Sequence, residues 1–513
     1  MSLGFFLVIT LKIIYKRDRI ITERMCDMNE KNDKNDKNKN LCRLIIEAEN
    51  AQKKNMDTFY RLQFHLMPPV GWMNDPNGLC QFDDEYHIFF QYSPLHVHGG
   101  MKAWGHYVTK DFVTYNYCGA PFLPDESFDT DGVFSGSAYV DKNGMHIFYT
   151  GNVELPGDYD YTTAGRLADT VLIESKDGYN FSEKEVVIPT SSYPETYSCH
   201  IRDPKVWKEN AYYYMVLGGR TREDQGRILV YRSDDLRYWS LLKELKTRTP
   251  FAYMWECPDL YKLESHYVLS FSPQGIDREE YRYQNIYHAG YFVTDTNPIT
   301  NDFSYESDSF REWDMGFDFY APQSFLDNQG RRIMIGWVGV PYAQYQYAEV
   351  AENWQHCLTI PRCLRIGKAQ GEERTIVYQY PIEEVNQLRT NQLKVENYRI
   401  DCDDDGMDIL VEELEGPFSI TLFDEISFSY ENDTLMLSLS DEIGYGRDCR
   451  KCKIKHVKNL RILLDVSLLE IFVNDGEYVF TSRFYKKEHG THIQFDCKDA
   501  KIYAYIMKRI EIS

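Results

Sequence analysis

Apolar and polar residues alternate in short runs from about residue 60 to the end of the chain. An alternation with a period of two is typical of β-strands that bury one face. Between residue 75 and about residue 340 a longer pattern repeats, in which a polar or acidic triplet precedes a strand, a polar turn and a second strand. The five copies begin at Asp75, Phe134, Arg202, Glu256 and Ala321. The sequence therefore predicts five similar hairpins.

A second pattern lies between copies of the first and predicts a further hairpin in each period. A Ser or Thr, an Asp two positions later and an aromatic residue four positions after that recur at 109–115, 175–181 and 233–239. Ser, Thr and Asp side chains bond to the backbone of their own turn, so we interpret these three aspartates as structural. Two hairpins in each period make a four-stranded sheet, and five such sheets close radially into a five-bladed β-propeller, which leaves few sheet edges exposed.

The repeat ends after Pro361, and a different pattern follows. A polar stretch over 366–390 predicts a linker region, and six short alternating segments between 418 and 484 predict strands. The run 474–476, Asn-Asp-Gly, is typical of a tight hairpin turn. The expected fold is all-β, with a propeller over 59–365 that carries the catalytic groups and an antiparallel β-sandwich over 391–513.

Residues 1–58 form an N-terminal extension in this scheme. Residues 4–15 are apolar, but the run is about half a membrane span and Lys12 interrupts it. Basic residues follow this run, whereas in a secretory signal they precede it. The low-complexity stretch 29–40 predicts disorder and 44–54 predicts a short helix. We expect a partly disordered extension, no membrane partner and a cytoplasmic location.

The charge balance argues against one class of partner. The 79 Asp and Glu residues outnumber the 57 Lys and Arg residues, and the formal net charge of -22 disfavours nucleic acid. The 40 Tyr and 28 Phe residues favour aromatic surfaces that stack on sugars. Among 12 cysteines, Cys449 and Cys452 form one Cys-x-x-Cys pair with no second pair nearby. The sequence thus predicts free thiols, no metal site and no cofactor.

Three of the five triplets carry a carboxylate: Asp75, Asp203 and Glu256. Each has a simple structural explanation, namely a self-capping Asn-Asp-Pro-Asn turn, an Arg–Asp ion pair and a buried ion-paired glutamate. Yet the triplets open equivalent inner strands, so propeller geometry would bring all three acids around one central funnel. Independent capping roles do not require acids at equivalent places, and we therefore favour a shared site.

Sequence neighbours predict different protonation states for these acids. Arg202 beside Asp203 should lower the pKa of that carboxyl. The amides beside Asp75 should keep it ionised and nucleophilic. The apolar neighbours in 255–258 predict a poorly hydrated Glu256 with a raised pKa, which suits a proton donor. One ionised and one protonated carboxyl is the pairing used in glycoside hydrolysis with retention.

Four motifs, in this order, resemble glycoside hydrolase family 32, which contains invertases, sucrose-6-phosphate hydrolases and fructan hydrolases. They are WMNDPNG (72–78), FSGS (134–137), RDP (202–204) and WECPD (255–259). The resemblance covers the chain from about residue 60 and implies that Asp75 is the nucleophile, Glu256 the general acid/base and Asp203 the transition-state stabiliser. It also implies a substrate-binding set of Trp72, Asn74, Gln91, Trp104, Phe134, Ser135, Arg202, Tyr320 and Trp337.

The expected activity is that of a retaining β-fructofuranosidase, which hydrolyses the terminal β-D-fructofuranosyl bond of sucrose or sucrose 6-phosphate by double displacement. An exo-acting fructan hydrolase, a fructosyltransferase and a catalytically silent sugar-binding propeller stay open as alternatives. The expected partner is a small carbohydrate, and the oligomeric state is not predicted. To bind a phosphorylated sugar, this acidic protein would need cations at the funnel rim. The candidates are Arg220, Arg222, Lys262 and Arg282; the alternative is that all four are ordinary surface charges.

Overall fold

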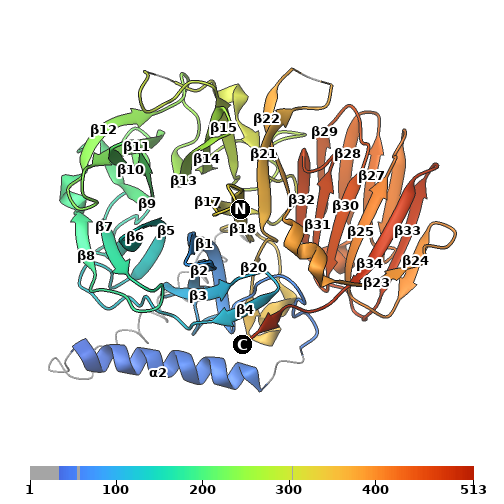
Figure 1. Ribbon diagram of the computed structural model, residues 1–513, viewed down its shortest axis with the longest axis horizontal. Coiled ribbons are helices and arrows are strands. Elements are labelled where there is room, and N and C mark those ends of the chain that lie inside the picture. Colours follow the sequence, from blue (N-terminus) through green and yellow to red (C-terminus); the bar gives the residue numbers. More distant parts are fainter. Residues whose placement is uncertain (1–33, 55–57, 303, 372) are drawn as a thin grey trace.

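The computed structural model describes residues 34–54, 58–302, 304–371 and 373–513, and most of its regular structure is strand (Figure 1). The all-β prediction is confirmed. Within these residues, no helix combines the length and the apolar character needed to cross a membrane. The helical elements are α2 (Lys34–Lys53), α3 (Asp441–Gly444) and the 3-10 turns η1 (Thr190–Ser192), η2 (Ser307–Ser309), η3 (Ala348–Glu352) and η4 (Glu383–Leu388).

Strands β1 to β22 form five sheets. The first contains β1 (Gly71–Phe82), β2 (Glu85–Ser93), β3 (Ala103–Thr109) and β4 (Thr114–Tyr117), with β19 (Trp354–Gln355) beside β1 and β35 (Glu511–Ile512) beside β4. The second contains β5 (Gly132–Asp141), β6 (Gly144–Glu154), β7 (Arg166–Ser175) and β8 (Glu185–Ile188). The third contains β9 (Tyr197–Glu209), β10 (Tyr212–Thr221), β11 (Gly226–Ser233) and β12 (Ser240–Leu245). The fourth contains β13 (Met254–Leu263), β14 (His266–Gln274), β15 (Gly290–Thr294) and β16 (Arg311–Glu312). The fifth contains β17 (Tyr320–Leu326), β18 (Arg332–Val338), β20 (Cys357–Leu358), β21 (Arg362–Lys368) and β22 (Thr375–Pro381).

The five predicted hairpins are all present as the first strand pair of each sheet. Strand β1 contacts β5, β5 contacts β9, β9 contacts β13, β13 contacts β17, and β17 contacts β1 again. The first strands therefore form a closed ring, and the remaining strands of each sheet extend outward from it (Figure 1). Equivalent residues of the five repeats consequently face the same central space.

The Ser/Thr-x-Asp turns also form as predicted. The hydroxyl oxygens of Thr109, Ser175 and Ser233 each accept a backbone N–H three residues later, at 2.9, 2.9 and 3.0 Å. The aspartate of each turn accepts two further backbone N–H groups. These aspartates are occupied by their own turns, which agrees with the structural role assigned to them.

The stretch 366–390, predicted to be a linker, is largely ordered strand and 3-10 turn instead. Strand β22 pairs with β21 from Lys368↔Thr375 to Arg362↔Pro381, and η4 follows at once. The polar residues between the two strands form their turn, so composition alone hid a strand whose Ile376, Val377 and Tyr378 are buried. A boundary at 365 cuts through the fifth sheet.

Two six-stranded antiparallel sheets follow, on the right of Figure 1. All six strands predicted between 418 and 484 are present, and both sheets contribute to one apolar core that includes Ile409, Ile462, Phe428 and Leu437. One sheet contains β23 (Arg389–Leu393), β34 (Lys501–Met507), β25 (Gly406–Glu412), β30 (Leu460–Asp465), β31 (Leu468–Val473) and β32 (Tyr478–Arg483). The other contains β24 (Arg399–Cys402), β33 (Thr491–Cys497), β26 (Phe418–Leu422), β27 (Ile426–Glu431), β28 (Thr434–Leu439) and β29 (Cys449–Lys453).

Helix α2 docks on the first sheet (Figure 1). Ile45 is buried in the core of that sheet, and the Glu49 carboxylate accepts hydrogen bonds from Tyr92 (3.0 Å) and Tyr117 (2.6 Å). The helix predicted over 44–54 is confirmed but begins ten residues earlier. The predicted disorder of 29–40 is therefore wrong for 34–40, because the docked face holds the helix in place; 29–33 and the apolar run 4–15 lie outside the described residues.

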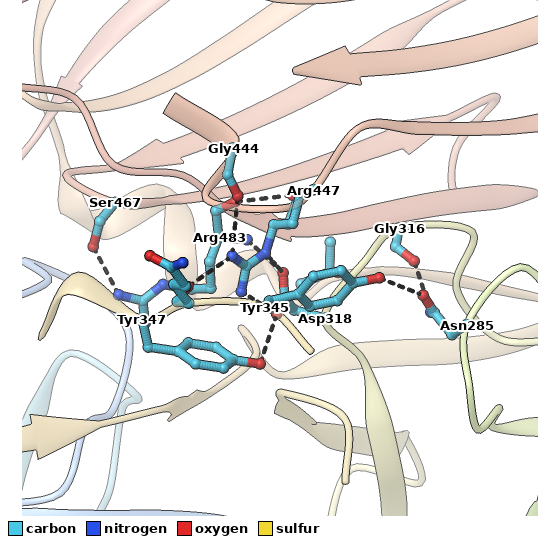
Figure 2. A network of polar contacts seen from close by, with 12 residues as sticks. Asn285, Gly316, Asp318, Tyr345, Tyr347, Gly444, Arg447, Ser467 and Arg483 are labelled. Carbon is cyan, nitrogen blue, oxygen red and sulfur yellow. Dashed lines mark hydrogen bonds and ion pairs between the residues drawn. The ribbon is translucent and has the colours of Figure 1, made fainter. Parts of the chain in front are cut away.

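A buried polar network joins the two parts of the chain (Figure 2). Asp318, which precedes β17, accepts hydrogen bonds from Arg447 Nε (2.7 Å) and Nη2 (2.8 Å) and from the backbone N–H of Arg483 (2.9 Å). Arg483 in turn donates to Ser467 (2.9 Å). The Asp318–Arg447 ion pair lies entirely out of water, so the second part of the chain fixes the end of the sheet ring from which β17 starts.

Candidate active site

A proline in the repeated triplet shapes the start of each inner strand that carries it. Pro76, Pro204, Pro258 and Pro322 lack the N–H that a ladder needs, and the pairing slips at the same place in each hairpin. The residue before three of these prolines has a positive φ: Asp203 at 64°, Cys257 at 48° and Ala321 at 47°. Such bulges redirect side chains. Here they turn the acids toward the centre of the ring.

Asp75 is held by two side-chain donors. Ser135 Oγ donates to Oδ2 at 2.6 Å, and Asn74 Nδ2 donates to Oδ1 at 3.0 Å. Asn74 is itself fixed, because its Oδ1 accepts hydrogen bonds from Trp72 Nε1 (2.8 Å) and Lys102 Nζ (2.8 Å). Burial raises the pKa of Asp75 and the charge of Glu256 adds to that effect, whereas Ser135, Asn74 and the Lys102 charge oppose it. The nucleophile candidate is thus rigidly oriented.

Asp203 is buried and accepts the backbone N–H of Cys257 at 2.9 Å. Burial, together with the charges of Glu256 and Asp75, raises its pKa to about 7 despite the opposing charge of Arg202. The prediction of a lowered pKa was wrong. Arg202 Nε stays 3.8 Å from Asp203 Oδ2, while its Nη2 donates directly to Glu256, so the adjacent residue in sequence is not its hydrogen-bonded partner.

Glu256 accepts hydrogen bonds from Arg202 and Gln274 and from Tyr320 Oη, the last at 2.6 Å. The apolar setting predicted for it was wrong, because successive strand residues face opposite sides. Trp255 is completely buried in the core on the other face. The structure thus surrounds this carboxyl with donors.

Cys257 connects two of the acids. Its Sγ lies 3.5 Å from Asp75 Oδ2 and 3.6 Å from Asp203 Oδ2, distances at which a thiol donates weakly. Burial and the three neighbouring carboxylates raise the thiol's pKa well above its usual value. A neutral Cys257 therefore fills the space between Asp75 and Asp203 without adding a negative charge.

The predicted substrate-binding residues divide into two groups. Those at the acids are Asn74, Ser135, Arg202 and Tyr320, which bond directly to one of them, and Trp72 and Trp337, which pack with Tyr320 around Cys257. Gln91 and Trp104 instead lie beneath the site, where Gln91 Nε2 donates to Val133 O (2.8 Å) and Trp104 Nε1 donates to Phe134 O (3.1 Å). Trp104 is fully buried, and its hydrogen bond positions the Phe134 segment.

Sequence reasoning missed four residues of this site. Lys102 bonds to Asn74 and Gln274 to Glu256, and the Tyr287 ring lies beside Tyr320 with its hydroxyl 3.5 Å from that of Tyr253. The hairpin register gave a signal for Gln274, because Glu256 pairs with Ser272 and Met254 with Gln274 across β13 and β14. Lys102 lies just before β3, and no motif marks it.

Two of the four cations predicted at the rim lie elsewhere in the structure. Lys262 lies beside the β13–β14 turn, at the opposite end of β13 from Glu256. Arg282 donates to Phe310 O (2.7 Å) and stacks on Tyr283, away from the acids. Arg220 and Arg222 are at the same end as the acids, because Gly218 pairs with Arg202 and the chain continues outward from there.

Comparison with known protein families identifies the family to which this chain belongs. Residues 65–381 match the N-terminal domain of glycosyl hydrolases family 32, and residues 364–507 match the C-terminal domain of the same family. The chain belongs to glycosyl hydrolase family 32. It is therefore a glycoside hydrolase, as its motifs predicted.

Relatives in this family cover nearly the whole chain. A sucrose-6-phosphate hydrolase of Bacillus subtilis is 36% identical over 83% of this chain and 89% of its own length. A raffinose invertase of Escherichia coli is 32% identical over 91% of this chain and 96% of its own. The solved sucrose-6-phosphate hydrolase of Lactobacillus gasseri superposes with a TM-score of 0.79 at 29% identity, over 91% of this chain and 96% of that one. A GH32 β-fructofuranosidase mutant of Bombyx mori in complex with sucrose gives 0.78 at 27% identity, over 93% and 100%.

Proposed function

We propose that this protein is a retaining β-fructofuranosidase that hydrolyses the terminal β-D-fructofuranosyl bond of sucrose or sucrose 6-phosphate. The observation that carries the proposal is the meeting of Asp75, Asp203 and Glu256 from three different sheets. Cys257 Sγ lies 3.5 Å from Asp75 and 3.6 Å from Asp203, and Arg202 pairs with Asp203 and Glu256. The relatives named for sucrose 6-phosphate and for sucrose support the substrate class. A cytoplasmic location is part of this proposal, since phosphorylated sugars are intracellular metabolites.

We further propose that the five sheets are the blades of a five-bladed β-propeller and that the two later sheets form a β-sandwich. The closed ring of first strands supports the propeller, and the apolar core shared by both six-stranded sheets supports the sandwich. The propeller then extends from about residue 59 through β22, and the sandwich occupies about 391–513.

In the first chemical step Asp75 attacks C2 of the fructosyl group. A bond forms between its carboxylate oxygen and C2, and the bond from C2 to the glycosidic oxygen breaks. Glu256 gives its proton to that oxygen, so the glucosyl part leaves as an alcohol. Ser135 and Asn74 fix the direction of attack, because each binds one oxygen of Asp75.

In the second step water cleaves the fructosyl ester. Glu256 takes a proton from the water as it attacks C2, and the ester bond to Asp75 breaks. Two inversions at C2 give β-fructose and restore both carboxyl groups to their starting states. Asp203 acts on the sugar: hydroxyl groups that donate to it stabilise its ionised form, and a grip that tightens as the ring flattens lowers the barrier.

A substrate panel tests the proposal. Purified protein is incubated with sucrose, sucrose 6-phosphate, inulin and levan, and released fructose is measured. The proposal predicts rapid release from one or both disaccharides and slow release from the polymers. Faster release from inulin or levan identifies a fructan hydrolase, oligosaccharide products identify a transferase, and no release from any sugar contradicts the proposal in favour of a silent binding protein.

A further inference from the structure

A row of aromatic side chains leads from Glu256 to the rim of the site. Tyr320 Oη donates to Glu256, and the ring centroids of Tyr320 and Tyr287 are 6.3 Å apart. The hydroxyl groups of Tyr287 and Tyr253 are 3.5 Å apart, and the guanidinium of Arg220 lies 4.5 Å from the centre of the Tyr253 ring. Arg220 thus forms the outer end of a wall that begins at the proton donor.

Arg220 is held in place with 12% of its side chain exposed to solvent. It comes from the outer end of β10, two residues beyond Gly218, which pairs with Arg202. Its Nη2 lies 2.7 Å from Asp224 Oδ1, and its Nη1 donates to Thr162 O at 3.3 Å. The stacked and paired guanidinium is already oriented, so a ligand would not have to order it.

Arg220 differs from the other arginines nearby in how exposed its counter-ion is. Burial lowers the pKa of His200, and the guanidinium groups of Arg202, Arg166 and Arg220 lie close enough to lower it further. Glu154, the partner of Arg166, is 16% exposed, and Glu256, the partner of Arg202, is 13% exposed. Asp224, the partner of Arg220, is 64% exposed. An exposed carboxylate is well hydrated and binds its partner weakly, so an incoming anion can replace it at small cost.

We propose that Arg220 binds the phosphate group of sucrose 6-phosphate and sets the preference for the phosphorylated sugar, with the glucosyl ring lying along Tyr287 and Tyr253. This inference rests on the proposed function, since it places the leaving group beside Glu256. Arginine suits the task because its planar guanidinium binds phosphate through two parallel hydrogen bonds. In a protein of net charge -22, such a fixed cation also offsets the general repulsion of a dianion.

The test compares Arg220→Gln with Arg222→Gln. Arg222 lies two residues further along, just after β10, and directs its Nε to Glu195 O (2.7 Å), so it serves as the matched control. For Arg220→Gln, kcat/KM for sucrose 6-phosphate should fall by about 10- to 100-fold, the usual scale of a lost charge-assisted hydrogen bond. The loss with sucrose should be about threefold or less. Arg222→Gln should behave as wild type, and added salt should weaken the wild-type preference.

Equal losses on both sugars would overturn the inference, because they would mark Arg220 as a structural support. Unchanged selectivity, or a selectivity loss in Arg222→Gln alone, would also overturn it. If the wild type hydrolyses neither sugar, the proposed function fails, and calorimetric binding of glucose 6-phosphate and glucose then tests Arg220 separately. Tighter wild-type binding of the phosphate, abolished by Arg220→Gln, supports the inference; equal binding of both ligands by the wild type contradicts it.

Discussion

Among the buried clusters of charged groups in the described residues, two balance charge in opposite ways. At the junction of Figure 2, Asp318 has a bidentate guanidinium from Arg447 and a further N–H from Arg483. In the candidate active site three carboxylates face only two cations: Arg202 pairs with Glu256 and lies 3.8 Å from Asp203, and the charge of Lys102 acts on Asp75. Burial raises the pKa of both aspartates. In the first cluster the buried carboxylate has a cationic partner, whereas in the second the carboxylates outnumber the cations.

This difference shows that a buried charge does not by itself mark function. A fully paired ion pair holds structure together, since removing one partner leaves the other desolvated and unpaired. An excess of carboxylates over cations costs stability and is retained where chemistry needs it. The two clusters should therefore respond to mutation in opposite ways.

The largest effect is expected from the acids of the active site. Asp75→Asn removes the covalent route and Glu256→Gln removes the proton donor, so each should lower kcat by about 10³-fold or more. The melting temperature should stay the same or rise, because each change removes one of three crowded negative charges. Fructose release and calorimetry measure the two quantities. A variant that lost activity only because it unfolded would break the comparison.

Asp318→Asn should give the reverse result. Arg447 would stay buried with its charge unpaired, which costs about 3–5 kcal/mol of unfolding free energy. Activity for each folded molecule should stay near the wild-type value, since Asp318 touches none of the three acids. Urea unfolding measures the loss. Glu442→Gln, at the exposed Lys487–Glu442 pair, is the control and should change little. A small loss at Asp318 would mean that the junction is not held by this network.

The stability of Asp203→Asn should depend on pH differently from the stability of the wild type, because of the charge imbalance at the site. The folded-state pKa of about 7 lies above the ordinary value of 3.8, so the folded protein holds this proton more tightly than the unfolded chain. The wild type therefore loses stability from this group as pH rises from about 4 to 7. Asparagine cannot ionise, so the variant should be more stable relative to wild type at pH 8 than at pH 5. The same stability difference at both pH values would contradict the raised pKa. The variant should also lower kcat.

The smallest predicted effect concerns Lys102. Its charge lowers the pKa of Asp75, so Lys102→Met should move the acid limb of the kcat/KM profile to higher pH. The loss should be confined to that limb, with little change at higher pH. Lys102→Arg keeps the charge and should keep the profile. A uniform loss at all pH values would assign Lys102 to holding Asn74 alone.

Much of the architecture could be predicted because it follows from local patterns. The period-two alternation gave the inner hairpins, and the Ser/Thr-x-Asp turns follow from side chains that bond within three residues. The β21–β22 hairpin was missed because a polar turn dominates its composition. Residues 34–40 were missed because tertiary docking, which a low-complexity sequence does not show, holds α2.

The acids themselves were predictable, but their electrostatics were not. Repetition of a proline-containing triplet brought Asp75, Asp203 and Glu256 together in the prediction and in the structure. Their surroundings come from other sheets, however. Arg202 bonds to Glu256 across a sheet boundary, and Gln274 and Tyr320 reach the same carboxyl from β14 and β17. Neighbours in sequence therefore gave the wrong pKa direction for Asp203.

The central claim is that Asp75 and Glu256 act in two displacements at C2. Proton NMR of the first fructose released from sucrose or sucrose 6-phosphate, recorded before mutarotation, tests it most directly. The account predicts the β anomer, the same configuration as in the substrate. The α anomer as first product would show a single displacement by water and would contradict the assignment of Asp75 as the nucleophile.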